Sequence, residues 1–277
     1  MLRQRIITAL VLLAFLLPAL LVRVAWPFAL LALAGFSAAA WEWGRLNGAG
    51  RASIGMALAL GVACFAALWA GWDAAPPRDV WWLALAVWVL GGTYVLRAGV
   101  GGWPRLPVAL RCATGFLLLW TAWLAMAAAR TLGLDFILSV FCLVWVADIA
   151  AYFGGRAFGK RKLAPLISPG KSWAGVWSGM LGAIVLAMFW VWLDGRLAVD
   201  GLSLYSRLLA RMGWPGLGLV VVFLATMSVV GDLFESLIKR AAGAKDSSGL
   251  LPGHGGVLDR VDALLPVFPI ALALVSL

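Results

Sequence analysis

The stretch Gly218–Arg240, GLVVVFLATMSVVGDLFESLIKR, begins as an apolar run and ends in charged residues. With the residues just before it, the run is long enough for a helix to cross the hydrocarbon core of a bilayer, which takes about 20 mostly apolar residues. Asp232 is followed, at intervals of three, four and seven residues, by Glu235, Ser236 and Lys239. These intervals place the four side chains on one face of a helix. The stretch therefore predicts a membrane-spanning helix with a polar stripe at one end.

The whole chain has the composition of an integral membrane protein. Of its 277 residues, 64% are hydrophobic and 12% are charged, whereas soluble domains carry about 25% charged residues. Candidate spans lie at 6–22, 25–43, 52–72, 80–96, 109–129, 133–153, 173–193, 214–236 and 263–277. We expect an all-α integral membrane protein, a polytopic helical bundle with about nine transmembrane helices. It forms one membrane domain, with N-terminal transmembrane spans in 1–130 and C-terminal spans with catalytic loops in 131–277.

The basic residues predict which side of the membrane each loop faces. If the N-terminus is cytoplasmic, all but six of the 22 Lys and Arg residues fall on the cytoplasmic side, as the positive-inside rule requires. The six exceptions are Arg23, Arg78, Arg130, Arg196, Arg207 and Arg211. This topology places loops 154–172 and 237–262 together on the cytoplasmic face.

Tryptophan is abundant, with 17 residues, and many lie near the ends of the predicted spans. Examples are Trp41, Trp43, Trp81, Trp82, Trp103, Trp173 and Trp214. Tryptophan is enriched where a membrane meets water, so we expect an interfacial aromatic belt.

The charged residues of 232–262 suggest a site for a metal–polyphosphate complex. Asp246, Asp259 and Asp262 follow Asp232, and converging carboxylates repel one another unless a cation neutralises them. Carboxylate oxygens suit Mg²⁺, which is usually held by one or two carboxylates plus substrate phosphates. The interleaved Lys and Arg side chains can bind phosphate oxygens. This pattern favours phosphoryl or nucleotidyl transfer, although an ion-paired helix end, with Lys239 beside Asp232 or Glu235, is a simpler alternative.

The segment Pro252–Gly256, PGHGG, interrupts any helix between these charges. Glycine lets backbone N–H groups approach an anion closely. His254, the single histidine of the chain, has three open roles: general acid or base, phosphate donor, or a hydrogen bonder that fixes the loop.

A second polar loop follows Asp148 and Tyr152 in the sixth predicted span. Its Arg156 and Lys160–Lys162 form a basic run that suits either phosphate or anionic lipid headgroups. Further on, Lys171 and Ser172 open the next span, where a helix N-terminus favours phosphate. The stretch is not a P-loop, because Ala164 stands where that motif needs glycine.

Residues 236–262 resemble the signature of the phosphatidate cytidylyltransferase (CDP-diacylglycerol synthase) family. The matching pattern is S-x-apolar-K-R, then K-D after four residues, then P-x-H-G-G-x-x-D-R-x-D. GDLFES, DIAAYFGGRAFGK and ISPGKSWAG are also similar to that family, so the resemblance covers about 145–265. The chain departs from the family at Gly170, Ser172 and Ala174, where a Lys, a Thr and a Glu are common. We therefore assign no carboxylate role to position 174.

The resemblance implies transfer of the CMP moiety of CTP to phosphatidic acid, giving CDP-diacylglycerol and pyrophosphate with Mg²⁺ as cofactor. It also implies a multi-pass protein of the bacterial cytoplasmic (inner) membrane, active site toward the cytoplasm, that binds no nucleic acid. The oligomeric state stays open, with a homodimer as one option.

Residue pattern and resemblance together predict three sets of site residues. The catalytic set is Asp232, Lys239, Arg240, Lys245, Asp246, His254, Asp259, Arg260 and Asp262. The substrate-binding set is Asp148, Tyr152, Arg156, Ser168, Lys171, Ser172, Glu235, Ser236, Gly255 and Gly256. The metal ligands are Asp232, Asp246 and Asp259.

Two other functions compete with this prediction. A CTP-dependent kinase of a lipid alcohol, such as a polyprenol, would release CDP and would need a base for the hydroxyl group. An ion or anion transporter would use intramembrane charges such as Asp148, but most charges of this chain lie in loops.

Overall fold

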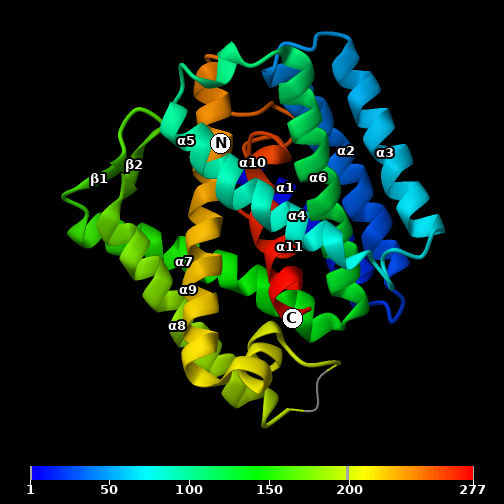
Figure 1. Cartoon of the computed structure of the whole chain (residues 1–277), viewed down its shortest axis with the longest axis vertical. Helices are drawn as coiled ribbons and strands as arrows, with labels where there is room; N and C mark the ends of the chain where they lie inside the picture. Colours follow the sequence, from blue (N-terminus) through cyan, green and yellow to red (C-terminus); the bar gives the residue numbers. More distant parts are fainter. Residues whose placement is uncertain (1, 198–199, 277) are drawn as a thin grey trace.

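In the computed structural model, which describes residues 2–197 and 200–276, a helix lies at each position where an apolar run predicts one (Figure 1). The helices are α1 (Leu2–Leu21), α2 (Trp26–Leu46), α3 (Ala52–Trp69), α4 (Arg78–Ala86) continuing through η1 (Val87–Gly92) into α5 (Thr93–Ala98), α6 (Val108–Thr131), α7 (Leu134–Phe158), α8 (Trp173–Asp194), α9 (Leu204–Ala241) and α11 (Leu264–Val275). Two short helices, η2 (Trp103–Arg105) and α10 (Leu258–Val261), lie in the connections.

In the described ranges, fewer helical segments than the predicted nine meet the length and apolar composition of a membrane span. Six helical segments are long and apolar enough to cross a membrane: α3, the continuous unit Arg78–Ala98, α6, α7, α8 and α9. The apolar part of α1, Ile6–Leu21, is shorter, and α11 has only 12 residues. A multi-pass helical membrane protein is therefore supported, whereas the count of about nine spans is not confirmed.

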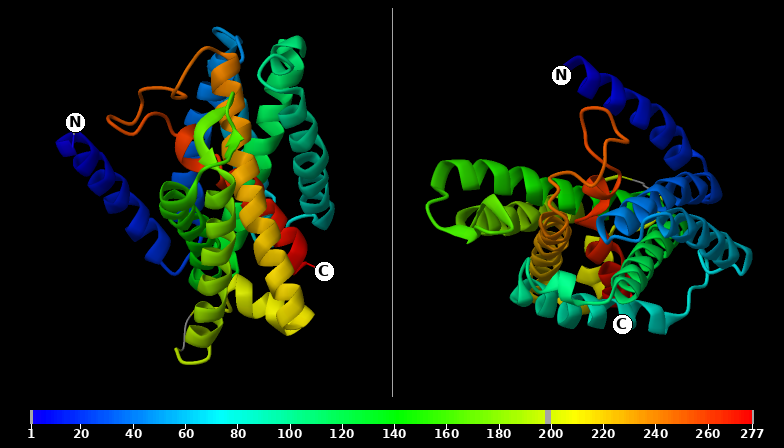
Figure 2. Two further views of the ribbon diagram at one scale, coloured as in Figure 1. Left: turned by 90° about the vertical axis from the view of Figure 1, so that its left-hand side faces the viewer. Right: turned by 90° about the horizontal axis from the view of Figure 1, so that it is seen from above.

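The loops that were predicted to share one face do meet at one end of the bundle. Segments 47–51, 99–107, 159–172 and 242–257 lie toward the upper end in Figure 1, and the C-terminus lies at the opposite end. Figure 2 shows the 242–257 loop and the start of α1 on the same side. The Thr8 hydroxyl of α1 donates a hydrogen bond to the carbonyl oxygen of Pro252 at 2.9 Å.

A small sheet interrupts the otherwise helical fold and was not predicted. Strands β1 (Lys162–Ala164) and β2 (Ser168–Ser172) pair antiparallel, with Lys162 opposite Ser172. Ser172 then ends the hairpin as the N-cap of α8, because its hydroxyl accepts a hydrogen bond from the N–H of Gly175 at 3.2 Å. Such a cap satisfies a backbone donor that the first turn leaves free.

Helices α7 and α8 pack closely because small residues line their contact. A Cβ atom on Gly175 would lie 2.8 Å from the carbonyl oxygen of Ala151, and one on Gly179 would lie 2.9 Å from that of Ala147. Small side chains let helix backbones approach within a membrane, where association depends on van der Waals packing. This approach fixes the hairpin and the α7 residues around Asp148 relative to each other.

An aromatic cluster joins α9 to the N-terminal helices. The Phe234 ring lies 5.4 Å from Trp88, 5.6 Å from Trp103 and 6.1 Å from Trp43, measured between ring centroids. Aromatic pairs at this separation contribute beyond their buried area. The prediction that these tryptophans form an interfacial belt is thus only partly correct. Trp43, Trp81 and Trp103 are buried, whereas Trp82, Trp173 and Trp214 are exposed.

Helix α9 contains a break and a close approach, both at glycines. At Gly213, φ is 66°, and Pro215 follows, so the helix breaks next to the start of the predicted span 214–236. Gly231, directly before Asp232, faces the junction of α10 and α11, where an added Cβ would lie 2.9 Å from Pro266 and would also meet the carbonyl oxygen of Asp262. This approach brings Asp232 near Asp262.

We expect Gly231→Ala to destabilise the protein by about 1–3 kcal/mol, because the added methyl group overpacks the contact with Pro266. The matched variant Gly218→Ala, at a position of α9 with open space around it, should be neutral or stabilising by up to about 1 kcal/mol, because alanine is the better helix former. Unfolding of both purified variants in detergent measures the difference. Equal stabilities would contradict the close approach.

Candidate active site

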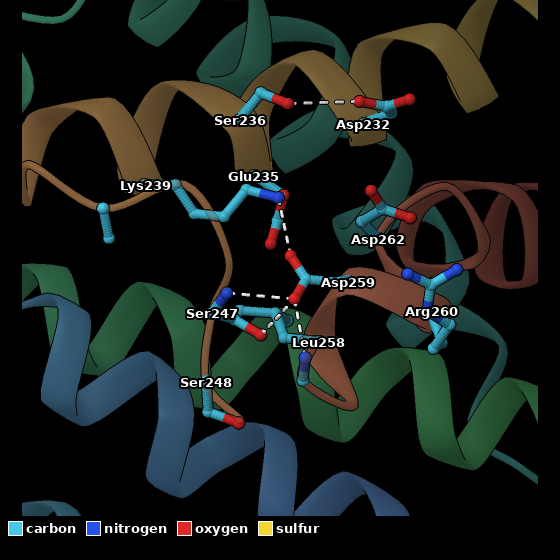
Figure 3. Close-up of polar contacts among 12 residues, drawn as sticks. Asp232, Glu235, Ser236, Lys239, Ser247, Ser248, Leu258, Asp259, Arg260 and Asp262 are labelled. Carbon is cyan, nitrogen blue, oxygen red and sulfur yellow. Dashed lines mark hydrogen bonds and ion pairs between the residues drawn. The ribbon is translucent and has the colours of Figure 1, made fainter. Parts of the chain in front are cut away.

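The predicted site residues come together from four elements at the upper end of the bundle. Helix α9 carries Asp232, Glu235, Ser236, Lys239 and Arg240. The following loop and α10 carry Lys245, Asp246, His254, Gly255, Gly256, Asp259 and Arg260, and Asp262 comes directly after α10. Helix α7 carries Asp148, Tyr152 and Arg156, and strand β2 carries Ser168, Lys171 and Ser172. Figure 3 shows the part of this set between α9 and α10.

A buried ammonium group connects α9 to α10. Lys239 Nζ lies 2.5 Å from Glu235 Oε2, one turn before it, and 2.6 Å from Asp259 Oδ1 (Figure 3). The Glu235, Asp259 and Lys239 side chains are 1%, 6% and 12% exposed. Breaking ion pairs this buried strongly destabilises a protein, because removing one partner leaves an uncompensated buried charge.

Asp259 also binds the loop that precedes it. Its Oδ2 accepts hydrogen bonds from the N–H and hydroxyl of Ser247, each at 2.9 Å, and from the N–H of Gly256 at 2.7 Å. Burial alone would raise the pKa of Asp259, but the Lys239 ammonium and the Gly256 and Ser247 N–H groups lower it to about 2. Asp259 is therefore an ionised anchor for the loop.

This network changes the roles expected for two residues. Lys239 was expected to offset phosphate charge and Asp259 to bind a metal. In the structure, each instead contacts protein partners that hold the loop against α9. The simpler alternative, an ion-paired helix end, correctly describes Glu235 with Lys239, while Asp232 pairs elsewhere.

Asp232 pairs with the hairpin and faces a cavity. Its Oδ2 lies 2.5 Å from Lys171 Nζ, and its Oδ1 accepts a hydrogen bond from Ser236 at 3.2 Å. The cavity measures about 640 Å³ between α7, α8, α9 and the hairpin, and its polar lining is Asp148, Tyr152, Arg156, Lys162, Lys171, Ser172 and Asp232. Its other walls include Ala151, Val176 and Val229. We call it the interhelical cavity.

A second cavity, of about 380 Å³, lies within the loop itself. Its lining is Lys245, Asp246, Ser248, Gly249, Leu251, Gly253, His254, Gly255 and Arg260. Arg260 closes one side by donating two hydrogen bonds to the carbonyl oxygen of His254, at 3.1 and 2.5 Å. We call it the loop cavity.

The three expected metal ligands do not form one cluster. Asp232 lines the interhelical cavity, Asp246 lines the loop cavity, and Asp259 is bound to its protein partners. In the part of the chain that the structure describes, no three His, Cys, Asp or Glu side chains gather as metal ligands. Burial and the charge of Asp232 raise the pKa of Asp262 to about 8, and Lys171 and Lys239 lower it only in part. Asp232 is thus paired with Lys171, whereas Asp262 forms no ion pair with a basic side chain of the described residues.

Several residues expected to bind substrate have a structural role. Ser172 caps α8, and Ser168 pairs with Ala164 in the sheet. Arg240, expected to offset phosphate charge, donates hydrogen bonds to the carbonyl oxygens of Ile167 and Ala244, at 3.4 and 3.1 Å, and so joins the hairpin to the loop.

Two glycines of the PGHGG segment, Gly255 and Gly256, are required by packing against carboxylates. Gly255 has φ of 83°, which favours glycine, and an added Cβ would lie 2.7 Å from Asp259 Oδ2. A Cβ on Gly256 would meet the Ser247 hydroxyl and the carboxylate of Glu42. The expectation that these glycines approach a phosphate is not needed to explain them.

Glu42, on α2, is the residue that the sequence analysis missed. It is fully buried and accepts hydrogen bonds from residues at both ends of the loop. The signal was available in the sequence, because Glu42 is a carboxylate inside the otherwise apolar predicted span 25–43. Placing a carboxylate in a membrane span costs free energy unless it has a specific partner.

Comparison with known proteins supports the resemblance over the full length. A sequence model of the Cytidylyltransferase family matches residues 3–277. The chain is 43% identical over 283 residues to a phosphatidate cytidylyltransferase of Pseudomonas aeruginosa, covering 99% of this chain and 97% of that protein. It is 49% identical over 139 residues to that of Haemophilus influenzae (50% of this chain, 44% of that protein) and 38% identical over 147 residues to that of Bacillus subtilis (52% and 49%). The predicted family is confirmed.

We expect Lys239→Met to cost about 3–5 kcal/mol in stability, because Glu235 and Asp259 would face each other in a buried site without their ammonium partner. Lys171→Met is the matched control. Its pair with Asp232 is more exposed, 26% and 30%, so solvent screens the interaction and the loss should be about 1 kcal/mol or less. Unfolding curves of the two variants in detergent test which one loses more stability. A larger loss of stability for Lys171→Met than for Lys239→Met would contradict the prediction.

Proposed function

The chain belongs to the cytidylyltransferase family, and we propose that it transfers the CMP moiety of CTP to phosphatidic acid, giving CDP-diacylglycerol and pyrophosphate in phospholipid biosynthesis. The observation that carries this proposal is the full-length similarity to a phosphatidate cytidylyltransferase. The enzyme class is nucleotidyltransferase.

The two cavities suit the two substrates. The interhelical cavity has Arg156, Lys162 and Lys171 beside apolar helix walls, so it fits a lipid phosphate whose acyl chains stay in the bilayer. The loop cavity has Lys245, Arg260 and His254, and all of its lining lies in the 245–260 segment, so it fits the triphosphate of CTP arriving from water. Lys and Arg bind phosphate oxygens through charge-assisted hydrogen bonds.

The transfer needs positioning more than acid–base chemistry. An oxygen of the phosphatidate phosphate forms a bond to the α-phosphorus of CTP, and the bond from that phosphorus to the oxygen bridging the β-phosphate breaks, so pyrophosphate leaves. The attacking phosphate ester needs no base, because its second pKa is about 6. The basic side chains of both cavities hold the phosphates in line and offset their charge.

Mg²⁺ completes the proposal as the cofactor. The residues fit an ion held mainly by substrate phosphates with one or two carboxylates, because Asp232 lies near a second carboxylate, Asp262, and Lys171 is the one basic side chain of the described residues that forms an ion pair with either of them. Asp232 is the first candidate ligand. Asp246, also predicted, lines the loop cavity proposed for the CTP phosphates, whereas Asp259 would contribute only after leaving its protein partners. When bound, the ion would offset charge on the phosphates.

The proposal places the protein in the bacterial cytoplasmic (inner) membrane with both cavities facing the cytoplasm. The distribution of basic residues supports this orientation, and CTP is then available on the correct side. Each proposed site residue belongs to a single chain, so the proposal does not depend on a homodimer, which stays a prediction.

Product analysis with purified protein, labelled CTP, phosphatidic acid and Mg²⁺ tests the reaction. We expect labelled CDP-diacylglycerol and one pyrophosphate per turnover. Release of CDP with phosphorylation of a lipid alcohol would indicate the kinase instead. Anion flux into liposomes without consumption of CTP would indicate the transporter.

We expect Asp232→Asn to lower kcat about 10²- to 10³-fold, the usual cost of losing one group that stabilises charge in a transition state. Asp79→Asn is the control, since Asp79 is an exposed carboxylate in the first turn of α4, at the other end of the bundle, and it should retain full activity. Chelation should abolish wild-type turnover and added Mg²⁺ should restore it. Undiminished turnover by Asp232→Asn would refute the ligand assignment.

A further inference from the structure

Glu42 makes contacts with both ends of the loop between α9 and α10. Its Oε1 accepts hydrogen bonds from the Ser248 hydroxyl at 2.5 Å and the Val257 N–H at 3.0 Å. Its Oε2 accepts them from the Ser247 hydroxyl at 3.1 Å and the Leu258 N–H at 2.7 Å. Each carboxylate oxygen thus has one hydroxyl donor and one backbone donor.

This arrangement suits a carboxylate and no neutral substitute. All four partners are donors, so an amide in place of the carboxylate would direct its NH₂ group at backbone N–H. Among the residues that the structure describes, no basic side chain forms an ion pair with Glu42. Its charge is therefore compensated by the loop itself, and a buried carboxylate without these donors would be costly.

The same contacts connect Glu42 to the anchor residue Asp259. The Ser247 hydroxyl lies within hydrogen-bond distance of both Glu42 and Asp259, at 3.1 and 2.9 Å. Gly256 packs its α-carbon against the Glu42 carboxylate, where no Cβ would fit. The loop therefore lies between a carboxylate of α2 and a carboxylate of α10.

The loop cavity depends on this closure. Each of its lining residues lies between 245 and 260, so no transmembrane helix contributes a wall. Its shape is set by how the loop is held at its ends, and Glu42 holds Ser247 and Ser248 beside Val257 and Leu258.

We infer that Glu42 is a positioning residue for nucleotidyl transfer, which closes the 247–258 loop into the CTP-binding cavity without touching substrate. This inference rests on the proposed function for the identity of the substrate. Loss of closure would misplace Lys245, His254 and Arg260, and a displacement of about 1 Å can cost about 100-fold in rate.

The test compares Glu42→Gln with the wild type and with Asn47→Ala. Asn47 is a buried residue directly after the same helix. It accepts a hydrogen bond from the Trp103 indole and, among the described residues, its side chain forms no hydrogen bond with the 247–258 loop. For Glu42→Gln we expect a fall in kcat of about 100-fold and a rise of at least about fivefold in KM for CTP, with KM for phosphatidic acid unchanged. Glu42→Asp, which keeps the charge, should recover part of the loss. Asn47→Ala should leave both KM values unchanged.

A purely structural role would reduce kcat in proportion to the folded fraction and leave both KM values alone, and that result would overturn the inference, as would wild-type kinetics. If Glu42→Gln does not fold, Ser247→Ala is the second variant. It removes one of the four donors to Glu42 at a residue outside the lining of the loop cavity, and the same selective rise in KM for CTP is expected; unchanged KM for CTP would overturn the inference. Trypsin cleavage at Lys245 and Arg260, scored without catalysis, should be faster in Glu42→Gln. Failure of the proposed function would instead show as wild-type protein that makes no CDP-diacylglycerol.

Discussion

The ammonium group of Lys239 lies between a carboxylate of its own helix and a carboxylate of α10, and the candidate active site depends on that arrangement. Glu235 and Asp259 are both almost fully buried, so neither would tolerate ionisation without the shared cation. With Lys239 in place, Asp259 is free to accept donors from the loop, and the loop is brought back to α9. The charges that looked like substrate ligands are thus divided. Some, such as Lys239 and Asp259, hold the protein together, and others line the two cavities proposed to bind the substrates.

Close backbone approach is the second requirement of the site. Gly231 allows the α10–α11 junction to reach α9, and the glycines of α8 allow that helix to reach α7. Both contacts place polar residues of separate helices around shared cavities. In a membrane such contacts replace the hydrophobic driving force that water supplies to soluble bundles. The glycine content of this chain therefore serves the geometry of the site as well as the packing of the spans.

The positions of the helices could be predicted because the length of an apolar run is a direct property of sequence. The stripe on α9 followed from helical periodicity, and the pairing of Glu235 with Lys239 is a local contact. The pairs Asp232–Lys171 and Lys239–Asp259 join segments that are distant in sequence, so residue spacing carried no information about them. Glu42 was missed for the same reason, because its partners lie in another part of the chain. The hairpin 162–172 was not predicted because its strands are too short to show a clear alternating pattern. Trp43 and Trp103 were predicted at the membrane interface but are buried, because a tryptophan at a helix end can face either lipid or protein.

The contacts of Glu42 join residues that are 205 to 216 positions apart in the chain. During synthesis, α2 leaves the ribosome long before Ser247 and Leu258 exist. Contacts of such high sequence separation form late, after the loop between them has been closed at an entropic cost. The N-terminal helices must therefore hold an unsatisfied carboxylate near water until the last tenth of the chain arrives. Assembly of the active site is in this way coupled to completion of the polypeptide, and a truncated chain would leave Glu42 without its donors.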